Sequence, residues 1–173
     1  MLDSEIEKSL NDQVAREAAS SNLYLSMASW CESHSLDGCA SFLYNQSEEE
    51  RTHMIKLMKY INDSGGHALV PKLAQPKIKF KSVREVFEDV LASETIISSS
   101  IHELVDLCTK RKDYTTLHFL QWYVTEQHEE EKLSRTILDK LNILGTESPG
   151  LFLFDKEITS LKVNTQINSS GEL

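Results

Sequence analysis

The segment LYNQSEEERTHMIKLMKY, residues 43–60, decides the fold. Alternating steps of three and four residues keep one set of its side chains on a single helix face. That set is Leu43, Gln46, Glu50, His53, Leu57 and Tyr60. A helical bundle buries such a stripe, yet Glu50 and His53 stand in the middle of it. Because an isolated buried carboxylate costs several kcal/mol, the stripe predicts a positive charge beside these residues.

Three further stretches, residues 10–28, 83–104 and 120–141, have the same spacing of apolar side chains. Each carries carboxylate or amide side chains near its middle and on the predicted buried face: Glu17, Glu94, Gln127 and Glu130. Residues in the middle of a helix meet at one level whichever way each helix runs. The sequence therefore predicts one interior site at half height in an all-α bundle.

Composition limits the classes of partner. The chain has 173 residues, enough for one domain with a sizeable core, and its net charge is −9. That charge disfavours nucleic acid and anionic membrane and suits a protein that handles cations. We expect neither a secretory signal at the start nor an apolar run that spans a bilayer. The odd, unpatterned set of three cysteines favours a reducing compartment, so a cytoplasmic location is predicted.

Capping residues predict the helix boundaries. The expected N-caps of the four long helices are Ser4, Asp37, Ser82 and Asp113. The expected ends are about Ser33, Ser64-Gly65-Gly66, Lys110-Arg111-Lys112 and Gly145. Ser148-Pro149 predicts a short fifth helix that ends at about Leu161. We expect a single domain over residues 1–161 and a flexible polar tail over residues 162–173.

The lengths of the connections predict the topology. The first and second helices, like the third and fourth, are joined by short turns, so each pair is an antiparallel hairpin. The stretch 66–81 contains Pro71 and Pro76 and little helical character. Fully extended it reaches roughly 50 Å, about the length of a 30-residue helix. The second and third helices can therefore run parallel, which predicts a ferritin-like four-helix bundle with one long crossover.

The ligand types indicate the chemistry. Glu50 and His53 form a Glu-x-x-His motif, and two such motifs plus two glutamates build di-iron carboxylate centres. Here the second motif reads Gln127-x-x-Glu130, without a histidine. A set of oxygens with one nitrogen suits iron or manganese and argues against structural zinc. A single motif or glutamate run is usually a solvated helix face, but its recurrence on four seams favours a metal site. Tyr24 is as readily a core tyrosine as a partner of a ligand carboxylate.

From Met1 to about Leu161 the chain resembles the prokaryotic non-haem ferritins. The most specific matches are EEERTHM, residues 48–54, and FLQWYVTEQHEEEK, residues 119–132. The resemblance implies a ferroxidase centre whose first iron is held by Glu17, Glu50 and His53. The second iron would be held by Glu50, Glu94 and Glu130. Gln127 and Tyr24 would support the pair, and a third iron would be bound by Glu49, Glu126 and Glu129 with Glu130 shared.

The resemblance also implies an assembly, a shell of 24 identical subunits that stores ferric mineral. The substrates would be ferrous iron and dioxygen, or hydrogen peroxide. The fifth helix fits these shells rather than the twelve-subunit relatives. Haem-binding bacterioferritins have a methionine after the first motif's glutamate, and this chain has Arg51 there, so no haem is expected.

Two other functions are compatible with parts of this pattern. A di-iron peroxidase or oxidase would use the same ligands to consume peroxide, and the preferred oxidant distinguishes it from a storage protein. A metal-free shell subunit would partner active chains. The complete set of seam glutamates argues against that subunit, because an inactive chain has no reason to retain them.

Overall fold

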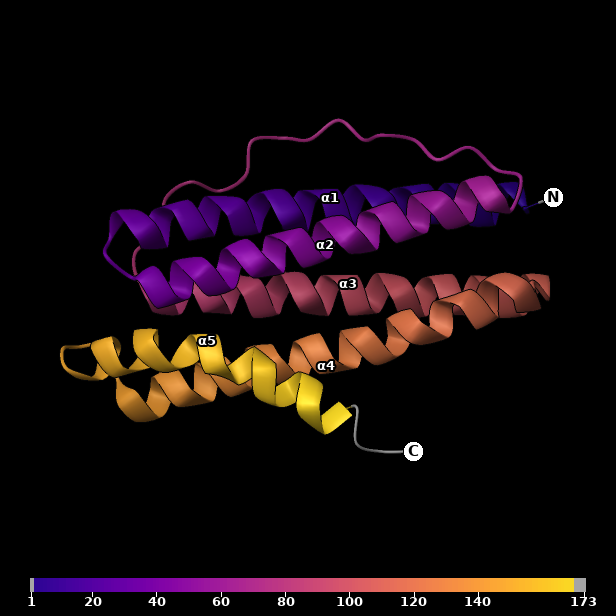
Figure 1. Ribbon diagram of the computed structural model, residues 1–173. Helices are drawn as coiled ribbons and strands as arrows, with labels where there is room; N and C mark the ends of the chain where they lie inside the picture. Colours follow the sequence, from indigo (N-terminus) through magenta and orange to yellow (C-terminus); the bar gives the residue numbers. More distant parts are fainter. Residues whose placement is uncertain (1, 170–173) are drawn as a thin grey trace.

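The structure is a computed structural model that describes the backbone of residues 2–169 and the side chains of residues 2–161. Within this part of the chain it is entirely helical (Figure 1). The helices are α1 (Ser4–Ser33), α2 (Asp37–Asp63), α3 (Val83–Arg111), α4 (Tyr114–Leu144) and α5 (Gly150–Ser169). The predicted fold class, four long helices followed by a fifth, is confirmed.

The helices form two antiparallel hairpins, α1–α2 and α3–α4, with a long crossover between them (Figure 1). The crossover runs along the whole length of the bundle and returns the chain to the end where α2 begins, so α2 and α3 are parallel. Polar bonds fasten it to α1. The Ser26 hydroxyl donates to the Lys77 carbonyl at 2.7 Å, and the Leu69 amide donates to the Asn11 side chain at 2.7 Å. The crossover is thus extended but held to the bundle.

Of the four predicted N-caps, those at Ser82 and Asp113 are confirmed and those at Ser4 and Asp37 are wrong. The Ser82 hydroxyl accepts a hydrogen bond from the Glu85 amide at 3.2 Å, and the Asp113 carboxylate accepts one from the Thr116 amide at 2.9 Å. For α1 the predicted cap, Ser4, is wrong by one residue. Asp3 is the cap, because its carboxylate accepts hydrogen bonds from the first amides of the helix.

The predicted cap of α2, Asp37, is wrong. The residue before the helix, Leu36, supplies no side-chain bond, and Asp155 of α5 serves this helix end instead. Its carboxylate accepts hydrogen bonds from the amides of Gly38 at 3.1 Å and Cys39 at 2.8 Å. A Cβ atom on Gly38 would lie 1.7 Å from the Asp155 carbonyl oxygen, so only glycine permits this approach. The start of α2 is therefore the docking point of α5.

Helix α5 differs from its prediction at both ends. It begins at Gly150, directly after a cis Ser148–Pro149 peptide, so the proline precedes the helix instead of occupying its first position. It continues to Ser169, beyond the predicted end at about Leu161. Residues 170–173 of the predicted tail lie outside the described part of the chain. The buried side chains of Phe154 and Ile158 join the core formed by the other helices.

The bundle core consists of two apolar clusters with a buried polar layer between them. On α2, Leu43 belongs to one cluster and Leu57 to the other, and Glu50 lies between. The same order holds on each long helix, where the intervening polar residues are Glu17, Glu50, His53, Glu94, Gln127 and Glu130. All six residues are at most 6% exposed. Apolar packing on both sides thus encloses a polar layer at half height.

Candidate metal centre

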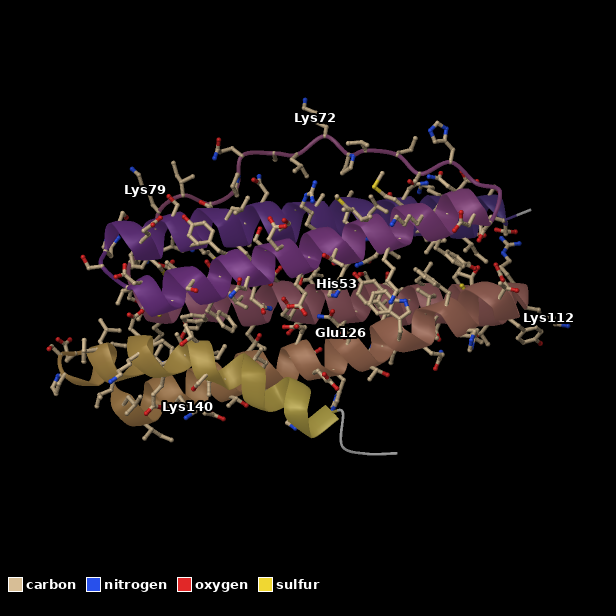
Figure 2. All side chains as sticks on the ribbon, viewed as in Figure 1. His53, Lys72, Lys79, Lys112, Glu126 and Lys140 are labelled. Atoms are coloured by element: carbon tan, nitrogen blue, oxygen red, sulfur yellow. The ribbon has the colours of Figure 1, made fainter. Side chains whose placement is uncertain are left out.

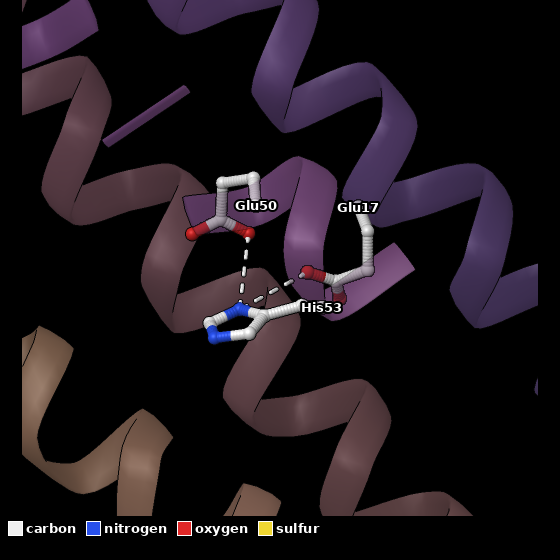
Figure 3. A group of neighbouring side chains, drawn as sticks. All are labelled: Glu17, Glu50 and His53. Carbon is white, nitrogen blue, oxygen red and sulfur yellow. Dashed lines mark ion pairs between the residues drawn. The ribbon is translucent and has the colours of Figure 1, made fainter. Parts of the chain in front are cut away.

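Three of the predicted ligands, Glu17 of α1 and Glu50 and His53 of α2, form one cluster (Figure 3). Each offers an oxygen or nitrogen atom, and these atoms all lie within 4.8 Å of one another. The Nδ1 atom of His53 is 3.9 Å from Oε2 of Glu17 and 3.8 Å from Oε2 of Glu50. These separations exceed hydrogen-bonding distance and leave space for an ion between the three groups.

The same three atoms have no hydrogen-bond partner. Oε2 of Glu17, Oε2 of Glu50 and Nδ1 of His53 are buried and unsatisfied. Leaving one such polar atom unpaired costs about 1–3 kcal/mol, and more when the group is charged. Three of them facing one point constitute an acceptor set without a donor. A single cation at that point would satisfy all three, so the residues fit a bound metal ion.

Glu94 of α3 lies in the same layer and is held by two donors. The Tyr24 hydroxyl of α1 donates a hydrogen bond to its Oε1 atom. Nε2 of Gln127 donates to the other carboxylate oxygen at 2.6 Å and to the Glu94 backbone carbonyl at 3.1 Å. Of the two roles that the sequence left open for Tyr24, the structure thus shows the hydrogen bond to a carboxylate of the polar layer. The two donors fix the carboxylate without neutralising its charge.

Glu130 of α4 is the fourth buried carboxylate, and its Oε2 atom accepts a hydrogen bond from Nε2 of Gln46 at 2.8 Å. Among the described residues, neither Glu130 nor Glu94 belongs to a three-ligand group as compact as that of Glu17, Glu50 and His53. The structure therefore brings together the predicted first-iron ligands tightly. It places Glu94 and Glu130 in the same layer, each oriented by an amide.

The electrostatics show how unfavourable this layer is for anions. Burial raises the pKa of Glu17, and it raises that of Glu50 well above its usual value with help from the nearby Glu17 and Glu94 carboxylates. Burial raises the pKa of Glu94 to about 7, although Tyr24 and Gln127 oppose the rise. Burial and the Glu94 charge raise the pKa of Glu130 to about 8. The layer therefore favours bound protons or bound cations over free carboxylates.

His53 is neutral at neutral pH. Burial lowers its pKa to about 4, and the positive charge of Lys56 contributes to the same shift. The close approaches of its ring to Glu17 and Glu50, dashed in Figure 3, are therefore not ion pairs between charged groups. A neutral imidazole nitrogen has a free lone pair, which is the form that binds a metal.

A second, more exposed cluster lies beside the first and shares His53 with it. Its members are Glu49, His53 and Glu126, whose ligand atoms also lie within 4.8 Å of one another. Figure 2 shows His53 and Glu126 close together between α2 and α4. Of the predicted third-iron ligands, Glu49 and Glu126 are thus brought together. Glu129 is outside this compact group, although its charge contributes to raising the pKa of Glu126.

Comparison with known proteins agrees with this architecture. The family profile described as "Ferritin-like domain" matches residues 7–144, which include all but the first three residues of the four bundle helices and every carboxylate of the two clusters and the polar layer. The chain belongs to the ferritin family. A "Probable bacterial non-heme ferritin-like protein" of Haemophilus influenzae is 47% identical to it over 161 residues, 93% of this chain and 98% of that protein. A "Bacterial non-heme ferritin" of Campylobacter jejuni is 44% identical over 95% of this chain and 98% of its own length.

Solved ferritin structures have the same fold. An open-pore ferritin of the archaeon Archaeoglobus fulgidus superposes with a TM-score of 0.89 at 34% identity, covering 92% of this chain and 98% of that one. A ferritin of Chlorobium tepidum superposes with a TM-score of 0.82 at 46% identity, covering 91% and 97% of the two chains. Within the described residues, this ferritin chain has no helix with the length and apolar character needed to cross a bilayer.

Sequence reasoning missed one residue of the ferritin centre, Gln13. Its amide donates a hydrogen bond to Oε1 of Glu17, whereas the other carboxylate oxygen, Oε2, is the one that approaches Nδ1 of His53. The signal was available, because Gln13 precedes Glu17 by four residues and shares its helix face. Gln46 was placed on the buried stripe but given no role, and the structure assigns it the bond to Glu130. Both glutamines are 1% exposed.

Proposed function

We propose that this ferritin chain is a ferroxidase and iron-storage subunit. It binds two ferrous ions in the buried polar layer, oxidises them with dioxygen and passes the ferric product on to a stored mineral. One observation carries the proposal: buried, unsatisfied acceptor atoms of Glu17, Glu50 and His53 converge on a single point in a layer that contains four carboxylates.

The layer divides into two ligand sets. Glu17, Glu50 and His53 would hold one ferrous ion. Glu94 and Glu130 would hold the other, and Glu50 would bridge the two. After burial, the charges of Glu17 and Glu94 both raise the pKa of Glu50, which supports the bridging role because each of these carboxylates must then lie near Glu50. Oxygen-rich ligands with one imidazole match the preferences of ferrous and ferric iron.

The proposed reaction needs two reducing ions at one place. Each ferrous ion gives up one electron, and dioxygen takes both electrons and two protons to become hydrogen peroxide. Metal binding releases protons from carboxylates whose pKa is raised, such as Glu94 and Glu130. Those carboxylates would keep the ions close to each other and compensate the charge added when iron becomes ferric.

Four neutral side chains would orient the ligands. Gln13 binds Glu17, Gln46 binds Glu130, and Glu94 is held by Tyr24 and Gln127. Hydrogen bonds of this kind fix a ligand's orientation, and losing one commonly costs 10–100-fold in metal affinity or activity. They leave Oε2 of Glu17 without a hydrogen bond, whereas both carboxylate oxygens of Glu94 accept one.

A third ion would bind at the outer cluster of Glu49, His53 and Glu126, with Glu129 and Glu130 nearby. This site would lie on the path that the ferric product takes away from the buried pair. It is more exposed than the pair, because the Glu49 and Glu126 side chains are only half-buried. A lower affinity is therefore expected for it.

We propose a shell of 24 subunits in the cytoplasm as the assembled form. Support comes from large apolar side chains on α1 and the crossover, where Leu25, Val70 and Ile78 are 42%, 82% and 58% exposed. Such a surface is unfavourable in water and is usually covered by another chain. The cavity of a closed shell would provide the volume in which mineral accumulates.

The test is to add ferrous iron in air to the iron-free protein, in large excess over the ligands. Ferric absorbance, dioxygen consumption and the iron retained by the high-mass fraction are then measured. We expect rapid oxidation at two irons per dioxygen and far more iron retained than the ligands can coordinate. Glu50→Ala should oxidise slowly, whereas Glu48→Ala, at an exposed position of the same glutamate run, should match the parent protein.

Two results would contradict the proposal. Slow oxidation by the parent protein, or equal rates in Glu50→Ala and the parent, would remove the ferroxidase role. Rapid oxidation with only a few irons retained per chain would remove the storage role. If hydrogen peroxide also outcompeted dioxygen as oxidant, a peroxide-consuming enzyme would be the better account.

A further inference from the structure

Lys56 places a positive charge at the rim of the outer acidic cluster. Its Nζ atom lies 3.4 Å from the centroid of the Trp122 ring, so the contact joins α2 to α4. The face of an indole ring attracts a cation at this distance. The Lys56 side chain is exposed and Trp122 is half-buried, which puts the ammonium at the boundary between protein and solvent.

Helix geometry relates this contact to the cluster of Glu49, His53 and Glu126. On α2, Lys56 follows His53 by three residues and Glu49 by seven, spacings that keep all three on one face. On α4, Trp122 precedes Glu126 by four residues and shares its face in the same way. Lys56 and Trp122 therefore stand about one helical turn from the cluster on their two helices and on the same faces as its members.

The charge of Lys56 acts on members of the cluster. Burial and the Glu129 carboxylate raise the pKa of Glu126, and Lys56 opposes that rise. Burial lowers the pKa of His53, and Lys56 adds to this lowering. Trp122 also contacts the His53 ring, with a centroid separation of 5.5 Å. Lys56, Trp122, His53 and Glu126 thus form one connected group.

We propose that Lys56 is a tethered cation that competes with a third metal ion for the cluster of Glu49, His53 and Glu126. An ion that binds there meets the ammonium charge or displaces it from Trp122. The outer cluster is thereby kept at low affinity, so that an ion stops there briefly instead of remaining. This inference rests on the proposed function, since it concerns ions leaving the buried pair.

A purely structural role for Lys56 makes a different prediction. If Lys56 only covered Trp122, its removal would loosen the contact between α2 and α4 and leave metal binding unchanged or weaker. Competition predicts tighter binding instead. At the separation of about one helical turn, removing one unit charge should strengthen the binding of a divalent ion about three- to tenfold.

The experiment is a calorimetric titration of the iron-free protein with Zn²⁺, which is redox-inactive. Lys56→Met keeps the length of the side chain and removes its charge. Lys56→Arg keeps the charge, and Lys59→Met removes a charge from an exposed position on the same helix. We expect the third zinc ion to bind about three- to tenfold more tightly to Lys56→Met only. The first two zinc ions should bind all four proteins equally.

Trp122 fluorescence provides a second readout. The chain has two tryptophans, so Trp30→Phe leaves Trp122 as the only one. In that background the third zinc ion should change the emission as the ammonium leaves the ring, and Lys56→Met should abolish the change. An unchanged or weaker third affinity in Lys56→Met, or no third ion in any variant, would overturn the competition. Failure of the first two ions to bind would instead contradict the proposed function.

Discussion

Gln127 donates two hydrogen bonds to Glu94, one to the carboxylate at 2.6 Å and one to the backbone carbonyl at 3.1 Å. It stands where a second Glu-x-x-His motif would have its glutamate, and Glu130 stands where that motif would have its histidine. The exchange converts one ligand into a donor. In the proposed centre Gln127 would therefore orient the second-iron ligand instead of binding iron itself.

Gln127→Leu should weaken the binding of the second metal ion and leave the binding of the first unchanged. The substitution removes the two hydrogen bonds that Gln127 donates to Glu94 at nearly constant volume and leaves the one from Tyr24, so we expect a loss of about 10–100-fold in affinity for the second ion. Calorimetric titration with Zn²⁺ measures the two ions separately. His128→Gln, at an exposed neighbouring position, is the control. Equal affinity for both ions in Gln127→Leu and the parent would show that the amide bonds do not matter.

Tyr24→Phe should slow ferrous oxidation with little effect on the fold. The ring remains and continues to pack in the core, but Glu94 loses the hydrogen bond from the hydroxyl. We expect the rate of ferrous oxidation to fall by a factor of up to about ten, as measured by stopped-flow absorbance at saturating iron. A rate equal to that of the parent protein would make Tyr24 a core tyrosine only, which is the alternative that its sequence position leaves open.

The stability of the iron-free protein should fall as the pH rises from 6.5 to 8. The pKa of Glu94 is raised from 4.5 to about 7 and that of Glu130 to about 8, so the folded state retains protons that the unfolded state has lost. Stability from these groups is fully present below pH 4.5 and is lost as the pH rises through the folded values. The free energy of unfolding should fall by an amount of the order of 1 kcal/mol per pH unit.

His53 acts in the opposite sense but at lower pH. Its pKa is lowered from 6.5 to about 4, so its contribution is present above pH 6.5 and is lost as the pH falls through 4. Above pH 6.5 the carboxylates alone therefore set the slope. Denaturant titrations at one protein concentration measure this dependence of stability on pH. Glu130→Gln should make the dependence less steep. Stability that rises from pH 6.5 to 8 would contradict the raised pKa values.

Asp155→Ala should destabilise the chain without affecting oxidation. It removes the one side-chain cap that the described residues supply at the start of α2, in which the amides of Gly38 and Cys39 donate to the carboxylate. Losing a cap costs about 0.5–2 kcal/mol, and chemical denaturation measures that loss. Asp155→Asn retains an acceptor oxygen and should lose less. A slower ferrous oxidation in Asp155→Ala would mean that α5 influences the centre, contrary to this account.

The sequence predicted those features that depend on spacing along one helix. Glu17, Glu50 and Glu94 could be assigned to the interior because steps of three and four define a helix face, and the buried layer contains all three. The crossover was predictable from its length and prolines. The caps at Ser82 and Asp113 were predictable because each bonds within its own first turn.

Features that depend on contacts between distant segments could not be predicted. Asp155 caps α2 from across the bundle, and no local pattern announces a cap supplied by another helix. Similarly, the resemblance to the non-haem ferritins implied a group of Glu49, Glu126 and Glu129, whereas the compact group in the structure is Glu49, His53 and Glu126. Which of these side chains meet depends on how α2 and α4 are rotated about their axes relative to each other. The spacing of residues along one helix does not determine that rotation.

The most direct test of the paired centre is the number of ferrous ions that the iron-free protein binds without air. Calorimetry under anaerobic conditions should give two tightly bound ions per chain and a weaker third. In Glu50→Ala the two tight ions should be lost together, because the bridging ligand serves both. One tight ion or none per chain in the parent protein, or an unchanged pair of tight ions in Glu50→Ala, would contradict a dinuclear centre built on Glu50.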